Sequence, residues 1–207
     1  FEDGTVLQQI AVPPVQPAEE DGDAGADAES EEKEGDAEIM PAATTVKYSP
    51  DGALIAVGCD NGAIFVFSAA DGALKSTCAS PHDGAVSALD FATGERPLLQ
   101  SNSAVAGELL FHDAETGERI NALEDVRDVE WATHTCDRTF ATQGLHSDRP
   151  TVDASNLISL SRASSGAFLA SAAQFGRVRL ARCPCPAPGA RSHAFIGHSS
   201  GVASVRF

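Results

Sequence analysis

Four side chains near the C-terminus are of types that bind zinc. Cys183 and Cys185 form a Cys-x-Cys pair, and His193 and His198 follow them in the chain. A structural zinc site needs four such ligands at defined spacings around a closed tetrahedron. Here there is only one close pair of cysteines, and a proline stands on each side of Cys185. His198 also fits a structural position in the repeat described below. The sequence therefore disfavours a zinc site, and we predict no metal and no cofactor.

A second group could support thiol chemistry. His134 and Cys136 are two residues apart, so on a strand both side chains would point to the same face, and Asp128 lies nearby in the chain. A cysteine nucleophile also needs an orienting group and an oxyanion site in one pocket. Nothing else in the sequence supplies these, and no glycine loop is of the kind that holds phosphates. A thiol enzyme at Cys136 therefore ranks last among the hypotheses, and we predict no catalytic residue.

Short strands must position these residues. From Ala43 onward, apolar runs of five to seven residues recur, and each is followed by a turn signal such as Pro50-Asp51-Gly52 or Asp60-Asn61-Gly62. The runs are rich in Val, Ile, Leu and Phe, which favour strands, and the breaks use residues that tolerate tight turns. No stretch between the turns has helical spacing. We therefore predict an all-β fold built as an antiparallel meander.

The meander repeats along the chain. Val46–Gly52 is similar to Ala88–Gly94, which lies 42 residues later, a third copy follows Leu157, and Gly197–Phe207 begins a fourth. A period of about 40–45 residues with four strands per unit is typical of WD40-type propeller blades. We predict a partial WD40-type β-propeller of about three blades plus two partial ones, with an acidic disordered insertion.

The blades depart from the usual WD40 pattern. Phe67-Ser68 and Phe111-His112 stand where a Trp-Asp dipeptide is usual, and Asn61 and Gln174 stand where an aspartate is usual. His82 and His198 fit the usual Gly-His position, although Pro81 precedes His82. We expect a polar network that is only partly present, so that apolar packing holds the blades together.

Most of the net charge of −16 lies in one segment. Glu19–Glu38 contains eleven acidic residues and one lysine, so these 20 residues carry −10 and the other 187 carry −6. Such a segment buries too little apolar area to fold, so we expect it to be disordered. It could be a partner-binding tail or a solvated linker, and we favour the linker because the segment is internal and low in aromatic residues. No basic face is evident, which argues against nucleic acid, and no apolar run is long enough to span a membrane. The odd count of five cysteines indicates reduced thiols in a reducing compartment rather than a disulfide framework.

These changes in composition give the predicted domain boundaries. Residues 1–14 are predicted to be the last strand of a preceding blade, 15–42 the acidic linker or insertion, and 43–207 the partial propeller. Within the propeller we place blades at about 43–80, 81–125 and 151–196, the start of the next blade at 197–207, and an insert at 126–150. Such a set of blades cannot close a ring and leaves strand edges unpaired. We expect the rest of the propeller before residue 1 and after residue 207, and we expect residues 43–207 alone to aggregate or to remain partly unfolded.

The insert carries a specific sequence string, Val126-Arg-Asp-Val-Glu-Trp-Ala-Thr-His-Thr-Cys136. Gln100-Ser-Asn-Ser103 precedes it, and Phe175-Gly-Arg-Val178 and Gly197-His-Ser-Ser200 follow it in order. Together these stretches closely resemble the echinoderm microtubule-associated protein-like family, whose second propeller has a segment of this kind between two blades. The resemblance covers residues 43–207, and residues 4–10 are similar to the end of the preceding blade.

The resemblance implies a non-enzymatic scaffold whose propeller is a protein–protein interaction module. Its implied partners are tubulin or microtubules and their associated proteins, in the cytoplasmic cytoskeleton and, as a further location, the ciliary axoneme. The alternative is a generic WD40 adaptor in a cytosolic or ciliary assembly that makes no direct contact with tubulin.

The insert also supplies the candidate partner-binding residues. Trp131, the only tryptophan, could be an exposed anchor for a partner, but its alternation with Val129 favours packing inside the insert. Arg127, Asp128 and Glu130 could form a partner-facing ion cluster or local pairs, and the sequence favours local pairs slightly.

Overall fold

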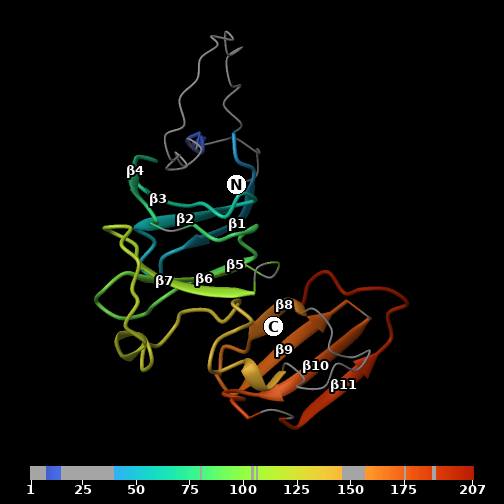
Figure 1. The fold of residues 1–207 in the computed structure, drawn as a ribbon. Coiled ribbons are helices and arrows are strands. Elements are labelled where there is room, and N and C mark those ends of the chain that lie inside the picture. The colour runs from blue at the N-terminus through green and yellow to red at the C-terminus, as the bar shows by residue number, and fades with distance from the viewer. Residues whose placement is uncertain are drawn as a thin grey trace, which may run out of the picture.

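The computed structural model describes residues 8–14, 40–79, 81–103, 105, 107–145, 157–174, 176–187 and 190–207. In this part of the chain, eleven strands form three antiparallel sheets, each of which is one blade of a propeller (Figure 1). No helix among the described residues is long and apolar enough to cross a membrane. The prediction of an all-β, partial propeller is confirmed.

Blade 1 is a four-stranded sheet whose strands follow the chain order, from the innermost to the outermost. The strands are β1 (Ala43–Tyr48), β2 (Leu54–Cys59), β3 (Ile64–Ser68) and β4 (Leu74–Thr77). The turn after β1 is closed by Asp51, whose Oδ1 accepts a hydrogen bond from the N–H of Ala53 at 3.0 Å. Gly52 lies between them at φ 73°, a left-handed conformation that glycine adopts without strain. The Pro-Asp-Gly signal therefore forms the predicted turn.

Blade 2 has three strands in the part of the chain that the structure describes. They are β5 (Ala88–Phe91), β6 (Leu98–Ser103) and β7 (Glu108–Asp113), in that order. After β7 the chain turns back and forms one isolated bridge, between His112 and Arg119, and then leaves the sheet. The prediction of four strands per blade therefore fails here among the described residues.

Blade 3 is again a four-stranded sheet, and its strand order is β11-β10-β9-β8. The strands are β8 (Leu157–Arg162), β9 (Phe168–Ala173), β10 (Arg177–Arg182) and β11 (Ser192–Ile196). Two short 3-10 turns, η1 (Leu123–Asp125) and η2 (Gln143–Leu145), lie in the segment that joins blades 2 and 3.

The main hydrophobic core lies between blades 1 and 2. Ile64 and Val66 of β3 point toward blade 2, where Leu89, Phe91 and Leu99 meet them, and all five are buried. Alternate residues of β3 therefore face this core, while Phe65 and Phe67 face the opposite side of blade 1. A sheet packed on both faces explains why β2 and β3 read as nearly continuous apolar runs rather than as alternating ones.

Both ends of the described chain pack on the blades without forming strands. Ile10 and Val12 contact the cluster on the outer side of blade 1. At the other end, the N–H groups of Val205 and Phe207 donate to the hydroxyl groups of Ser159 and Ser161 in β8. Residues 205–207 thus run beside β8, the first strand of blade 3. Residues 1–7 and 15–39, which include most of the predicted acidic linker, lie outside the described part, as do residues 146–156.

Candidate partner-binding site

The insert adds a strand-like segment along the inner edge of blade 2. Trp131 forms an isolated bridge with Ala92, and the N–H of Ala132 donates to the carbonyl of Phe91 at 2.8 Å. The N–H of Thr93 donates to the carbonyl of Glu130, also at 2.8 Å. The insert therefore begins as a continuation of the blade rather than as a free surface loop.

A buried carboxylate holds the rest of this segment in place. Asp90 of β5 has no exposed surface, and its two oxygens accept hydrogen bonds from the insert's backbone and hydroxyl groups. The N–H groups of Thr135 and Cys136 donate at 2.9 Å, the hydroxyl of Thr135 donates at 2.8 Å, and the hydroxyl of Thr133 donates as well. The amide of Gln100 adds a fifth donor at 3.1 Å. Burying a carboxylate is costly unless it is hydrogen-bonded, and here the insert supplies most of its partners.

Trp131 lies inside this structure, not on its surface. Its relative exposure is 8 %, and it packs with Ala92 and Leu98. Its ring centroid is 6.0 Å from that of Phe111, a distance typical of aromatic pairs in cores. The side chain is therefore placed as a packing residue, and in this conformation a partner could not use it as an exposed anchor.

The three charged candidates are all exposed. Arg127 donates to Asp128 at 3.2 Å, and both side chains are more than three-quarters exposed. Glu130 is also exposed, and its backbone carbonyl, rather than its carboxylate, makes the contact with Thr93. An ion pair this exposed contributes little to stability, so these side chains are available to a partner.

The insert and β7 together enclose an apolar groove of about 700 Å³. Trp131 and Phe111 contribute to its lining, and Leu123 and Phe140 stand beside it with 69 % and 70 % of their surfaces exposed. The remaining lining residues are Gln100, Leu109, Glu124, Val126, Arg127, Asp128, Val129, His134, Thr139 and Ala141. Exposed apolar side chains beside a pocket with charged groups around it are typical of a surface that binds protein. We call this feature the insert groove.

His134 connects the insert to blade 3. Its Nε2 lies 2.7 Å from Nη1 of Arg162, at the end of β8. A guanidinium can only donate, so Nε2 accepts and the ring is neutral with its proton on Nδ1. Burial lowers the pKa of His134, and the positive charge of Arg162 lowers this pKa further. This hydrogen bond links the insert to the end of β8.

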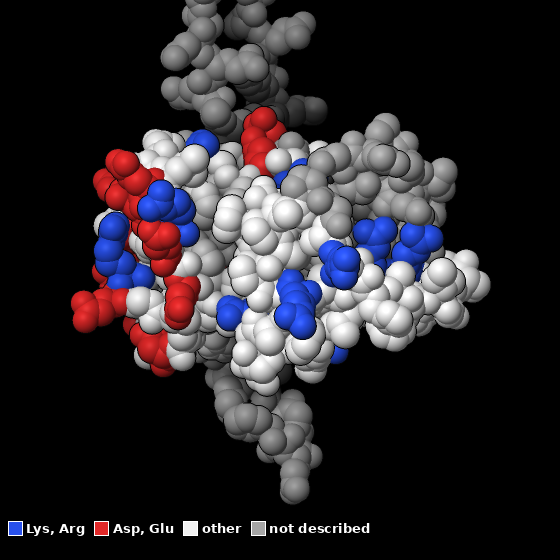
Figure 2. Space-filling view, turned by 90° about the horizontal axis from the view of Figure 1, so that it is seen from below, with Lys and Arg blue, Asp and Glu red and all other residues white. Residues whose placement is uncertain are grey.

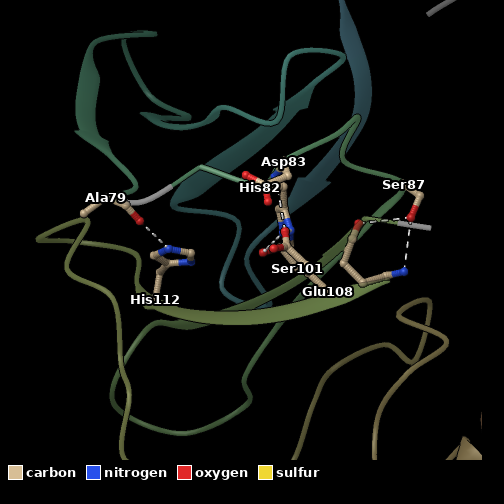
Figure 3. Close-up of polar contacts among 8 residues, drawn as sticks. Ala79, His82, Asp83, Ser87, Ser101, Glu108 and His112 are labelled. Carbon is tan, nitrogen blue, oxygen red and sulfur yellow. Dashed lines mark hydrogen bonds and ion pairs between the residues drawn. The ribbon is translucent and has the colours of Figure 1, made fainter. Parts of the chain in front are cut away.

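A second polar network lies within blade 2 (Figure 3). Nδ1 of His82 is 3.0 Å from Glu108, and Nε2 is 2.9 Å from the hydroxyl of Ser101. Burial lowers the pKa of His82 despite the nearby carboxylate, so the neutral ring donates to Glu108 and accepts from Ser101. The pKa of Glu108 is lowered by the hydrogen bond from His82 and by that from the N–H of Asp83. The network joins the segment before β5 to β6 and β7 of the same blade, which is a structural role.

The WD40-like position in β7 is also structural. His112 is fully buried, and its Nε2–H donates to the carbonyl of Ala79 at 2.9 Å, which ties β7 to the segment after β4. Burial lowers the pKa of His112, which is therefore neutral at pH 7. A histidine thus replaces the aspartate of the usual dipeptide as a hydrogen-bonding group between blades.

The thiols are placed for packing rather than for chemistry. Cys136 is fully buried, and burial followed by the charge of Asp90 raises its pKa well above the ordinary value. Burial also raises the pKa of Cys59 to about 11 and that of Cys78 to about 12. A nucleophilic cysteine needs the thiolate, so these groups are unreactive at neutral pH.

The zinc hypothesis is also without structural support in the described residues. None of them form a group of three or more His, Cys, Asp or Glu side chains arranged around a metal position. Cys185 packs with Leu145 and Leu160, and the ring of His193 stacks edge-on against Phe195 at 4.7 Å.

Two residues of the networks escaped prediction from the sequence. Asp90 lies inside an apolar strand, and its partners in the insert begin 43 residues later. An ionisable residue in such a strand was a signal that could have been followed, since buried charges need partners. Glu108 is the acidic partner of His82, and it lies at the start of β7, 26 residues later in the chain.

Comparison with known proteins gives one consistent result. Residues 28–207 match the family described as "Echinoderm microtubule-associated protein second beta-propeller". Human echinoderm microtubule-associated protein-like 2 is 34 % identical over 168 residues, which cover 79 % of this chain and 25 % of that protein. The 77 kDa echinoderm microtubule-associated protein of Strongylocentrotus purpuratus is 36 % identical over 166 residues, which cover 78 % and 24 %. The chain thus spans about a quarter of the length of these relatives.

Among solved structures, the computationally designed Ika4 protein aligns with a TM-score of 0.43 at 18 % identity, over 82 % of this chain and 81 % of that one. A score this low carries no argument about the fold.

Proposed function

Because the chain belongs to the echinoderm microtubule-associated protein-like family, we propose that it is a non-enzymatic scaffold that binds tubulin or microtubules through its propeller. The observation that carries this proposal is the match of most of the chain to relatives named as microtubule-associated proteins. We place the protein in the cytoplasmic cytoskeleton, with the ciliary axoneme as a further location.

The structure supports the scaffold role through the insert groove. The string of residues that resembles the family lines part of this groove, and Leu123 and Phe140, just before and just after the string, are exposed beside the charged pair of Arg127 and Asp128. The N–H of Cys136 donates to the buried Asp90, and the thiol of Cys136 is itself buried. Such a surface can hold a partner by apolar contact with a charged rim. The proposal therefore assigns contact with tubulin to the insert groove, with Arg127, Asp128 and Glu130 around it.

Co-pelleting with microtubules tests the proposal. The full chain should sediment with microtubules at moderate salt, and Phe140→Ser should reduce the bound fraction several-fold because it removes an exposed apolar contact. Ile158→Ser is the matched control, because Ile158 is also a large exposed apolar side chain but lines a different groove.

The outcomes separate the two functions. If both variants sediment like the parent chain, the insert groove is not the tubulin contact. If the chain sediments only after a third protein is added, it is an adaptor without direct tubulin contact, and the proposal fails.

A further inference from the structure

Blade 2 has no fourth strand in the part of the chain that the structure describes, and this leaves the outer edge of β7 partly open. Residues 118–120 begin to pair there. The N–H of Asp113 donates to the carbonyl of Glu118 at 3.0 Å, and the N–H of Ile120 donates to the carbonyl of Phe111 at 2.8 Å. The chain then turns away into η1. Pairing along this edge therefore starts at one end of β7 and stops at Ile120.

These two hydrogen bonds show which backbone groups of β7 point outward. In an antiparallel ladder, each residue directs its N–H and its carbonyl to the same neighbouring strand, and successive residues alternate between the two neighbours. Phe111 and Asp113 face away from β6, so Leu109, two residues earlier, faces away from β6 as well. Among the described residues, no hydrogen bond reaches the N–H or the carbonyl of Leu109, or the N–H of Phe111. We call these three backbone groups the open edge.

The open edge borders the insert groove. The side chains of Leu109 and Phe111 share one face of β7, and both line the groove. Ile120 packs against the same core cluster as Phe111, so it lies on this face too. A strand that continued the line of Ile120 would therefore direct its alternate side chains into the groove, next to the exposed Leu123 and Phe140.

The surroundings of the open edge are acidic. Residues 114–126, which follow β7, contain four acidic residues and one basic residue. The four are exposed, and in the described part of the chain they form no ion pair within 4.0 Å: Glu115, Glu118, Glu124 and Asp125. Figure 2 shows acidic side chains gathered, with some basic ones among them, on the left, which is the side on which β7 lies in Figure 1. Charge complementarity therefore favours a segment that carries lysine or arginine, and the net charge of −16 acts in the same direction.

We propose that an extended segment of a partner protein completes blade 2 by pairing antiparallel with the open edge. The segment has apolar residues at alternate positions and lysine or arginine between them. Its backbone supplies partners for the groups of Leu109 and Phe111, and its apolar side chains fill the insert groove. In strand addition of this kind, backbone hydrogen bonds provide affinity and pockets for alternate side chains provide specificity. The inference rests on the proposed function only in taking the insert groove as the partner site.

Fluorescence anisotropy with a labelled peptide of about nine residues, long enough to pair along an edge strand, tests the proposal on the full chain. In this probe, valine alternates with lysine and threonine. Methylation of the valine nitrogens should weaken binding at least about tenfold, because in this antiparallel register the residues that enter the groove also donate to β7. Methylation of the lysine and threonine nitrogens is the matched control and should change the affinity less than about threefold, since those N–H groups face solvent. Replacement of the lysines by glutamates should weaken binding at least about tenfold.

Variants of the chain test the same contact from the other side. Leu109→Pro removes one N–H of the open edge, at an edge position where sheets tolerate proline, and should weaken binding at least about tenfold. Leu109→Ala keeps that N–H and should weaken binding less. Phe140→Ser should weaken binding several-fold, whereas Ile158→Ser, in a different groove, should leave the affinity unchanged. Circular dichroism spectra of all four variants should match that of the parent chain.

Four results decide against the strand pairing or against its link to tubulin. Equal binding of the two methylated peptides means that side chains alone make the contact, and absence of peptide binding by the parent chain also refutes the pairing. If the parent chain is instead a dimer in analytical ultracentrifugation and Leu109→Pro dissociates it, a second copy occupies the edge and the proposal is wrong. Sedimentation with microtubules without peptide binding refutes the pairing and leaves the proposed function standing. Peptide binding without sedimentation supports the pairing and refutes tubulin as the partner.

The test does not depend on the stability of one variant. If Leu109→Pro loses its β-sheet spectrum, the two methylated peptides still give the answer, because both are measured on the parent chain.

Discussion

Removal of the Asp90 carboxylate should release the insert from blade 2. The substitution Asp90→Ala leaves the N–H groups of Thr135 and Cys136 and the amide of Gln100 without their acceptor in a buried place. The two threonine hydroxyls can rotate to other acceptors, but the backbone groups cannot. A buried donor that loses its partner costs about 1–3 kcal/mol, so three such donors that partly relax should cost about 3–5 kcal/mol in total.

The loss should be measurable by two independent signals. For a chain of this size each kcal/mol corresponds to a fall of about 2–4 °C in Tm, so the thermal midpoint should drop by about 6–20 °C. Trp131 is the only tryptophan and lies in the insert with 8 % exposure. Its emission should shift to longer wavelength, and acrylamide should quench it more strongly, if the insert leaves the blade.

A control and a refuting result complete this test. Asp128→Ala removes a carboxylate from the same insert at a position that is 81 % exposed, and it should change the free energy of unfolding by less than about 0.5 kcal/mol. If Asp90→Ala has the same tryptophan emission and the same urea midpoint as the parent chain, the carboxylate does not hold the insert on blade 2.

Three further predictions follow from burial and backbone geometry. The pKa of each of three buried histidines, His82, His112 and His134, is lowered in the folded state, so the unfolded chain binds more protons below pH 6.5 and stability is lost as the pH falls. The free energy of unfolding, measured by urea denaturation, should decrease from pH 7.5 to 5.5 by up to about 1.4 kcal/mol per histidine. Gly62→Ala should lower the free energy of unfolding by at least about 2 kcal/mol, because Gly62 has φ 86° and a Cβ there would lie 1.9 Å from a backbone oxygen. Gly52→Ala has open space around it and should cost only the left-handed strain of about 1 kcal/mol. Thermal melts compare the two variants, and equal losses of stability would contradict the steric argument. Iodoacetamide at pH 8 should label the half-buried Cys183 before the buried Cys136 in the folded chain, as mass spectrometry can show, and early labelling of Cys136 would mean that the insert opens readily.

The strands were predictable because their signals are local. Each apolar run and its turn residues lie within about ten positions, and Pro50-Asp51-Gly52 forms its turn by a hydrogen bond that spans two residues. The apolar run after Pro50-Asp51-Gly52 forms β2, and the third copy of the repeat opens with β8. The missing fourth strand of blade 2 was not predictable in this way, because the repeat assigned every blade the same number of strands.

The candidate site was predictable only in part. The string from Val126 to Cys136 was recognised by its residues, and packing was correctly favoured for Trp131. The groove itself was not foreseen, because Leu123 and Phe140 become its exposed apolar residues only through the path of the insert.

The sequence by itself determined the all-β class, the propeller repeat and the family, because apolar strand patterns, turn residues and a specific string of residues each lie within a short stretch of the chain. Tertiary structure decided which polar groups meet. Asp90 finds donors that lie 45 residues away, and His82 finds Glu108 at a distance of 26 residues. Hydrogen bonds and charge pairs act over a few ångströms in space whatever the separation along the chain, so these contacts exist only once the blades have packed.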